Sequence, residues 1–265
     1  MKVEVSAQKL VESGAHFGHM LRRTNPKMKR FQYTVRDGNF IFDLIKTKGH
    51  LEEALELLTD AASKGKKILI VGTKKQIQDQ VVAFAKETGS FWVSERWLGG
   101  TFTNFDQIKR TLNRSQETKS KMNSGEFKGY TKKEKLMMSW SIEKTEKMMG
   151  GLTGMEKTPD IMIVIDTKKE FAAVNEAKLV KVPVIGIVDS NGDPDQIDYP
   201  IPANDDATAS VSYILSLMKD AIMAGKGSSP KSEEVKTEKK EKAEKKETKS
   251  KEVKAKAAKA KKEAK

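Results

Sequence analysis

The chain has 265 residues, a formal net charge of +13 and no cysteine. The lack of cysteine excludes disulfides, thiolate metal sites and cysteine nucleophiles, and it fits a cytoplasmic protein. The longest aliphatic run, Ile161 to Ile165, is far too short to cross a bilayer, so no membrane partner is expected. Residues 226–265 hold 16 lysines and 8 glutamates, which is +8 of the total charge, and such a tail indicates a polyanionic partner.

The N-terminal region predicts a short helix, a basic stretch and a β-hairpin. Ser6 can cap the helix and Gly14 can end it. An Asp-Gly turn at positions 37 and 38 joins FQYTV to FIFDL, a pattern typical of a hairpin. From Thr47 onward, apolar residues recur on one face until Gly65, so an amphipathic helix follows.

Aliphatic segments separated by helical ones then predict a mainly parallel sheet. They lie at 67–72, 91–93, 160–166 and 182–189. They do not alternate apolar with polar residues, so each strand is expected to be buried on both faces, as in an α/β fold. A last helix at 204–224, ended by Gly225, closes a body of residues 1–225.

One segment interrupts this alternation. Residues 103–122 and 131–149 have helical spacing, and Thr131 and Glu134 form a capping box at the start of the second helix. Their apolar stripes thin toward the connecting turn. We therefore expect an antiparallel helical hairpin, inserted at about 103–149, that projects from the body.

The tail at 226–265 is dominated by Lys, Glu and Ala and has almost no large apolar residue. It cannot bury enough apolar surface to fold alone, so we expect it to be disordered.

A nucleotide- or sugar-phosphate-binding enzyme is the main alternative function. Lys74 and Lys75 follow a predicted strand and open a helix, where phosphates often bind. The glycine motifs GxxxxGK[ST] and GxGxxG are absent, however, and so is the GxSxG nucleophile motif. The simpler interpretation is a tight strand-to-helix turn.

A divalent ion is the only cofactor that the residues suggest. The HxxH pair could bind it with acids from loops at the sheet end, and the residues concerned are His16, His19, Asp189, Asp193 and Asp205. The spacing lacks the glutamate of the zincin motif. The alternative is that both histidines make only packing or backbone contacts, and no cofactor is then bound.

The segment between residues 22 and 30 is the clearest candidate for phosphate binding. It carries five cations with no acid before Asp37, namely Arg22, Arg23, Lys27, Lys29 and Arg30. Pro26 argues against a plain helix face, although solvated charge remains the alternative. Phe31 and Tyr33 could stack on bases or pack inward.

The stretch SERWLGGT lies between the sheet and the inserted hairpin. Its apolar wedge and adjacent glycines can pack as a hinge or meet another protein, and these residues are Trp97, Leu98, Gly99 and Gly100. Arg96 could instead reach RNA.

Five long motifs, GAHFGHMLRRTNPKMKRF, KILIVGTKK, FWVSERWLGGTFTNF, TPDIMIVID and VPVIGIVDSNGDPDQIDYPIPANDDA, resemble in order and spacing the S-two family of the bacterial small ribosomal subunit. The resemblance covers about residues 5–225. It implies a flavodoxin-like sheet with an inserted coiled-coil hairpin. It also implies a structural protein without catalysis or a small-molecule substrate, on the solvent side of the subunit near the junction of head and body.

The partners implied by this resemblance are small-subunit ribosomal RNA and other small-subunit proteins, including the large OB-repeat protein that captures messenger RNA. The cations expected to contact RNA are Arg22, Arg23, Lys27, Lys29, Arg30, Arg36, Lys74, Lys75, Arg96, Lys109, Arg110 and Arg114. A protein-docking module without RNA contact is a third hypothesis. The tail lies outside the resemblance, and its expected role is a non-specific electrostatic tether.

Overall fold

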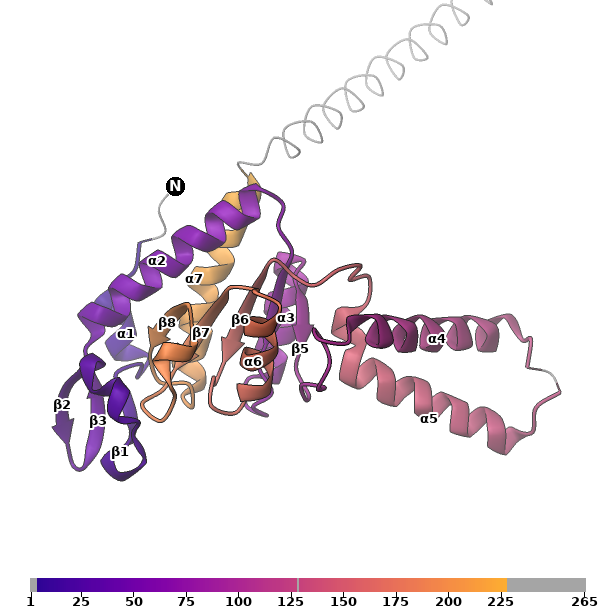
Figure 1. The fold of residues 1–265 in the computed structure, drawn as a ribbon, viewed down its shortest axis with the longest axis horizontal. Helices are drawn as coiled ribbons and strands as arrows, with labels where there is room; N and C mark the ends of the chain where they lie inside the picture. Colours follow the sequence, from indigo (N-terminus) through magenta and orange to yellow (C-terminus); the bar gives the residue numbers. More distant parts are fainter. Residues whose placement is uncertain (1–3, 128, 228–265) are drawn as a thin grey trace, which may run out of the picture.

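A computed structural model describes residues 4–127 and 129–227 of the chain (Figure 1). Its centre is a five-stranded parallel sheet in the order β5-β4-β6-β7-β8. The strands are β4 (Ile68–Val71), β5 (Phe91–Val93), β6 (Ile161–Ile165), β7 (Val184–Val188) and β8 (Tyr199–Pro202). Within the described ranges, no helix is long and apolar enough to span a bilayer.

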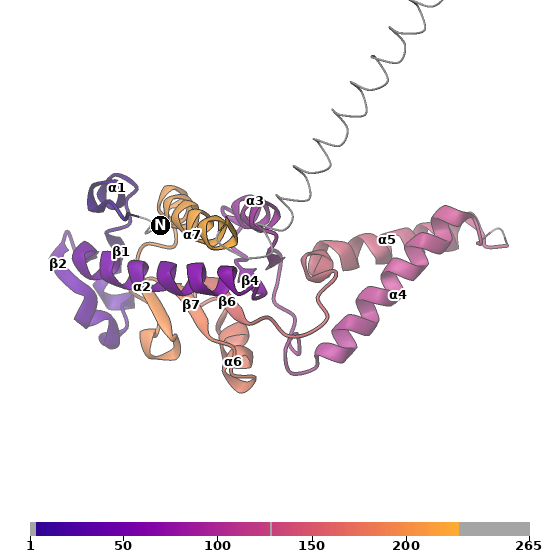
Figure 2. The same cartoon turned by 90° about the horizontal axis from the view of Figure 1, so that it is seen from above.

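Helices cover both faces of this sheet. One core joins α2 (Leu44–Ser63), α3 (Gln78–Thr88) and α7 (Thr208–Gly227) to alternate strand residues such as Ile70 and Ile163. The other core joins α6 (Phe171–Leu179) to the remaining strand residues, such as Leu69 and Val164. Figure 2 shows α6 on the opposite side of the sheet from α3 and α7. The prediction of a parallel α/β sheet flanked by helices is confirmed.

Strand β8 was not predicted from the sequence. It contains Pro200 and Pro202, and proline lacks the N–H that a central strand needs. The strand lies at the edge of the sheet, paired only with β7, where the missing donors cost little. The edge position explains why a segment that reads as a loop is extended.

A smaller unit precedes the sheet. It consists of α1 (Ala7–Glu12), β1 (Phe17–Met20), the 3-10 turns η1 (Leu21–Arg23) and η2 (Pro26–Phe31), β2 (Gln32–Arg36) and β3 (Asn39–Phe42). The Ser6 side chain accepts from the Lys9 N–H, as expected of a cap. The predicted hairpin is confirmed, with Asp37 and Gly38 both at positive φ in its turn. β1, which was not predicted, completes an antiparallel β1-β3-β2 sheet.

Several helix boundaries differ from the sequence prediction: α4 is shifted by two residues from the expected 103–122, and α7 starts at Thr208 and not at 204. α2 begins at Leu44 and not at Thr47, because Asp43 caps it through the Ile45 N–H. Gly225 does not end α7, which continues to Gly227. A Cβ at Gly225 would lie 2.4 Å from the Thr59 carbonyl oxygen, so this glycine permits the close approach of α7 to α2.

The insertion consists of α4 (Phe105–Ser124) and α5 (Lys132–Met149), followed by the 3-10 turn η3 (Gly150–Leu152). Figure 1 shows both helices projecting from the β5 edge, at the end of the molecule opposite the small sheet. The Thr131–Glu134 capping box is present. Of the tail predicted to be disordered at 226–265, residues 226 and 227 belong to α7, and residues 228–265 lie outside the described residues.

Candidate nucleic-acid interface

The carboxyl edge of the large sheet is where an α/β enzyme would bind its ligand. Strands β5 and β6 lie on opposite sides of β4, so the loops after β4 and β6 meet at the usual ligand crevice. Here Thr73 donates a hydrogen bond to the buried Glu170 carboxylate, and Lys169 Nζ donates to the Thr73 carbonyl oxygen over 3.0 Å. Thr73, Glu170 and Lys169 are thus bonded to one another.

Lys74 lies in the same region, and its ammonium group is bound by three carboxylates. Its Nζ lies 2.6 Å from Asp205, 2.7 Å from Asp206 and 3.0 Å from Asp166, and the side chain is 14% exposed. Burial alone would lower the pKa of Lys74, but the three carboxylates outweigh it and raise that pKa. Lys74 is therefore unavailable to a phosphate and is left out of the interface proposed below.

The charge of this edge also disfavours the enzyme alternative. Acids gather here, because Asp166, Asp205 and Asp206 all approach Lys74. Burial, together with the nearby Asp189 and Asp166, raises the pKa of Asp205. A Cβ on Gly72 would lie 3.0 Å from Val81, so this glycine packs α3 against the sheet. A phosphate entering here would meet carboxylates and a packed turn.

The structure brings together only part of the metal-ligand set expected from the sequence. His19 Nδ1 lies 3.1 Å from Asp189, and its Nε2 lies 3.4 Å from Asp206, a residue that sequence reasoning missed. One ligand atom from each lies within 4.8 Å of the others, a spacing that could hold a divalent ion. The hydrogen bond to Asp189 raises the pKa of His19, although burial opposes it. A protonated His19 can therefore neutralise the charge of these carboxylates in place of a metal ion.

The other expected ligands have different neighbours. The His16 ring contacts the Phe17 ring at a tilt of 39° with centroids 4.0 Å apart, and burial lowers the pKa of His16. Asp193 pairs with Lys27, while Asp205 pairs with Lys74. These three residues are not part of one metal site.

The basic segment at 22–30 is pinned to the body with its cations outward. Asn25 Oδ1 accepts from the Lys27 N–H, and the Asn25 N–H donates to the Ser190 carbonyl oxygen over 2.7 Å. Met28 and Phe31 are buried in the second core. The chain between these anchors is held in 3-10 turns, so little backbone entropy remains to be lost on binding.

Two of the five cations are paired with acids that are remote in sequence. Lys27 Nζ lies 2.9 Å from Asp193 and 3.2 Å from Asp195, and Arg30 lies 3.0 Å from Asp195. The expectation that no acid compensates the charge of these cations is therefore wrong for Lys27 and Arg30. The exposed cations that make no ion pair within the described residues are Arg22, Arg23 and Lys29, and these three define the segment surface.

The remaining candidate cations lie elsewhere on the surface. Arg36 is 82% exposed beside Asp37, and Lys75 and Arg96 are exposed on loops after β4 and β5. The α4 cations Lys109, Arg110 and Arg114, which define the arm surface, make no ion pair within the described residues. Figure 1 places the arm and the segment at opposite ends of the molecule.

The glycine-rich stretch folds inward at the root of the hairpin. Trp97 is buried and meets the Phe102 ring edge-on, with centroids 5.0 Å apart. Leu98 packs against the second core, and Gly100 adopts a φ of +92° that favours glycine. The wedge therefore contributes to packing, while Arg96 beside it stays exposed.

Glu176 on α6 holds this root, and sequence reasoning missed it. Its carboxylate accepts from Gly100 N at 2.7 Å, Phe102 N at 2.9 Å, Trp97 Nε1 at 3.2 Å and Thr103 N at 3.3 Å. Burial alone would raise the pKa of Glu176, but these donors lower it. The available signal was an acid on the alanine- and valine-rich face of a short helix.

Comparison with known proteins identifies the family of this chain. Residues 10–225 match the family described as Ribosomal protein S2. The small ribosomal subunit protein uS2 of Petrotoga mobilis is 48% identical over 222 residues, which are 84% of this chain and 77% of that protein. The chain therefore belongs to the ribosomal protein S2 family and is a structural constituent of the small ribosomal subunit, not an enzyme.

Proposed function

We propose that this protein binds small-subunit ribosomal RNA through two separate cationic areas, the segment surface and the arm surface. Exposed arginine and lysine bind phosphates and release counterions, which supplies affinity without sequence selection. The two areas lie at opposite ends of the molecule, so they suit distant RNA segments (Figure 1).

The observation that carries the proposal is that two of the five cations at 22–30 form ion pairs with the body, whereas three are exposed and make no ion pair within the described residues. Lys27 and Arg30 bind Asp193 and Asp195, which fixes the segment against the body. Arg22, Arg23 and Lys29 are left exposed on a chain already held in place. A preorganised array of cations is what phosphate binding requires.

The helices α4 and α5 would act as an arm. α4 has 20 residues and spans about 30 Å at 1.5 Å per residue. Leu112 and Ile142 are buried, whereas Leu136, Met137 and Trp140 are exposed. We take this as support for a coiled-coil arm that presents its cations to RNA away from the body.

A matched pair of triple variants tests the segment surface. Arg22→Ala/Arg23→Ala/Lys29→Ala should reduce the slope of log affinity against log salt by about 2–3, since each phosphate contact contributes about 0.7–0.9. The control is Lys66→Ala/Lys86→Ala/Lys178→Ala, which removes the same charge from three exposed lysines on other surfaces. Binding of the full chain to small-subunit RNA at several salt concentrations measures both, and equal slopes for the two variants would contradict the proposal.

A second candidate function is docking of the large OB-repeat ribosomal protein on the small sheet. Several large apolar side chains are exposed there and at the start of α2, namely Phe17, Met20, Leu21, Tyr33, Val35 and Ile45. Exposed apolar groups that gather in one region mark protein-binding surfaces. They favour a protein neighbour at this end of the molecule.

The docking surface can be tested by pull-down with the purified OB-repeat protein. Tyr33→Ser/Ile45→Ser should weaken capture, because both side chains are at least 75% exposed and would lose apolar contact area. Leu179→Ser, also 75% exposed but on α6, is the control. Capture that survives the double variant would remove this candidate.

The domain organisation stays a proposal as well. We propose a body of residues 1–225 with the insertion at about 103–149, followed by the tail as a non-specific tether to RNA. Lys226 donates to the Thr88 carbonyl oxygen, so a truncation should follow Gly227 and spare this contact. Such a truncation is expected to slow association with subunits and leave final occupancy unchanged. A truncated chain that fails to enter subunits would contradict the tether role.

A further inference from the structure

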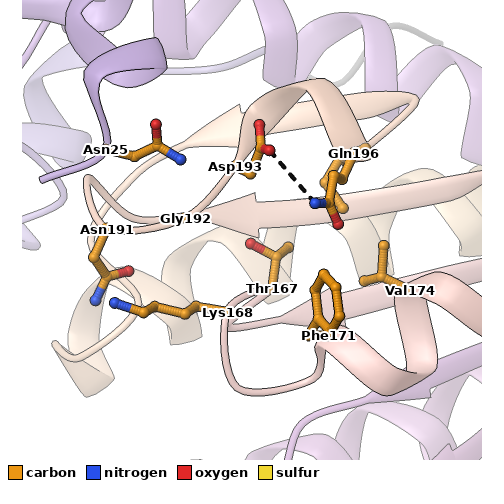
Figure 3. Close-up of a pocket in the computed structure, with 10 residues that line it drawn as sticks. Asn25, Thr167, Lys168, Phe171, Val174, Asn191, Gly192, Asp193 and Gln196 are labelled. Atoms are coloured by element: carbon orange, nitrogen blue, oxygen red, sulfur yellow. Dashed lines mark hydrogen bonds between the residues drawn. The ribbon is translucent and has the colours of Figure 1, made fainter.

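A small cavity lies beside the segment surface, between the loops that follow β6 and β7 (Figure 3). Its volume is about 150 Å³, and its walls include Asn25, Thr167, Lys168, Phe171, Asn191 and Gln196. Asn25 belongs to the basic segment, so the cavity is continuous with the proposed RNA surface.

Two polar groups at this cavity are left without partners. Thr167 is 6% exposed, and its Oγ1 is buried with no hydrogen-bond partner among the described residues. Asn191 contacts His19 through its Nδ2, 3.1 Å from Nε2, while its Oδ1 is buried and unpaired in the same way. A buried polar group without a partner is unfavourable, so a ligand that bonds to these two atoms gains affinity.

The other walls suit a flat, charged molecule. Phe171 is 51% exposed and presents its ring at the cavity, as Figure 3 shows. Lys168 lines the same cavity, is exposed and makes no ion pair within the described ranges. The one acid, Asp193, is bonded to Lys27 and to Gln196 Nε2, so its charge is compensated.

We propose that this cavity receives one unpaired base of ribosomal RNA. Proteins bind unpaired bases by stacking on an aromatic ring and hydrogen bonding to the base edge, with a cation on the adjacent phosphate. Phe171, the Thr167 and Asn191 polar atoms and Lys168 supply those three elements. A phenylalanine side chain of a protein would fill the space but leave both polar atoms unsatisfied, whereas a base edge carries several donors and acceptors. The inference rests on RNA binding by the neighbouring segment surface.

Substitutions at the cavity separate base binding from phosphate binding. In the full chain bound to small-subunit RNA, Phe171→Ala should weaken affinity about tenfold or more, because a stacked base is lost. Thr167→Val removes only a hydroxyl without a protein partner, so the fold should hold while affinity falls several-fold. Neither should change the salt slope, whereas Lys168→Ala should lower it by about 1. Leu179→Ala, exposed on the same helix as Phe171, is the control.

Chemical modification of RNA bases in the same complexes gives the direct readout. The wild-type chain should protect one unpaired base that becomes reactive with Phe171→Ala and with Thr167→Val. Unchanged affinity and protection in both variants would overturn the cavity proposal. If the triple segment variant still lowered the salt slope, RNA binding itself would stand. Crosslinks from residue 171 that map to a protein would also overturn the base assignment.

Discussion

Replacing Glu176 by glutamine should destabilise the protein through the root of the arm. The side chain is 9% exposed, and its two oxygens accept from four N–H groups of residues 97–103. Glutamine keeps one oxygen but turns an amide nitrogen toward the donors on the other side. Two N–H groups, one buried and one partly buried, then lose their acceptor, and each such loss costs about 1–3 kcal/mol.

The expected loss of unfolding free energy is therefore about 2–4 kcal/mol, which lowers the melting temperature by about 5–15 °C for a chain of this size. Denaturant unfolding at pH 7 gives the first quantity and a thermal scan the second. Limited proteolysis should also cut faster between Trp97 and Asn104, because the loop loses its contact with α6.

The pH dependence provides a separate check. The pKa of Glu176 is lowered in the folded protein from its usual 4.5, so its ionised form contributes stability above about pH 4.5. That contribution is lost as the pH falls through the folded pKa. The difference between wild type and Glu176→Gln should therefore shrink in acid.

Glu170→Gln is the matched control at the start of the same helix. Burial raises the pKa of Glu170, and its carboxylate accepts a hydrogen bond from Thr73, which a glutamine oxygen can also accept. We expect a change within about 1 kcal/mol. A Glu176→Gln protein as stable as wild type, or a Glu170→Gln protein that lost more, would refute the reasoning.

Three further predictions concern the fold. The pKa of His19 is raised above its usual 6.5, so protonated His19 should add about 1–2 kcal/mol to the free energy of unfolding below pH 6.5. This contribution should disappear as the pH rises through the folded pKa, and urea unfolding of His19→Gln and wild type at several pH values measures it. Gly225→Ala should cost about 1–3 kcal/mol in thermal unfolding, because the new Cβ meets the Thr59 carbonyl, while Gly227→Ala, with no atom within 4 Å, should be neutral or stabilising. Deleting Asn104–Met149 should leave one cooperative calorimetric transition at a lower temperature, because the arm adds few residues to the core; loss of that transition would contradict an appended arm.

The three central strands of the large sheet could be predicted because burial on both faces leaves an aliphatic signature in each segment. The expectation of full burial is wrong for β5, an edge strand in which Phe91 and Trp92 are only half-buried. Segment 160–166 contains β6 with every residue buried, and 67–72 contains β4 likewise. β8 lacked that signature, since its prolines are tolerated only by its edge position. The end of α7 was missed because Gly225 does not end its helix but permits the close approach of α7 to α2.

The site was harder to predict, because its contacts join residues far apart in the chain. Asp193 and Asp195 reach Lys27 only through the loop after β7, and Asp206 reaches Lys74 only across the sheet edge. Counting charges along the segment therefore overstated its free cations. Geometry decides which cations are free, and no local pattern records it.

Lys27 and Lys29 allow that point to be tested within one segment. Both are exposed lysines two positions apart, but Lys27 lies within 3.2 Å of two carboxylates and Lys29 has no ion pair among the described residues. A phosphate that approaches Lys27 also meets Asp193 and Asp195, so the net attraction is small. Exposed pairs themselves contribute only about 0–1 kcal/mol to folding, so neither substitution should destabilise the protein.

We therefore expect Lys29→Ala to lower the salt slope of RNA binding by about 1 and Lys27→Ala to change it much less. Asp193→Asn/Asp195→Asn should have the opposite effect, because it frees Lys27 and Arg30 to bind phosphate and steepens the slope. Titrations of the full chain with small-subunit RNA between low and moderate salt measure all three. If Lys27→Ala and Lys29→Ala lowered the slope equally, the two acids would not be shielding this part of the segment. The number of exposed cations would then govern RNA affinity, irrespective of their ion pairs.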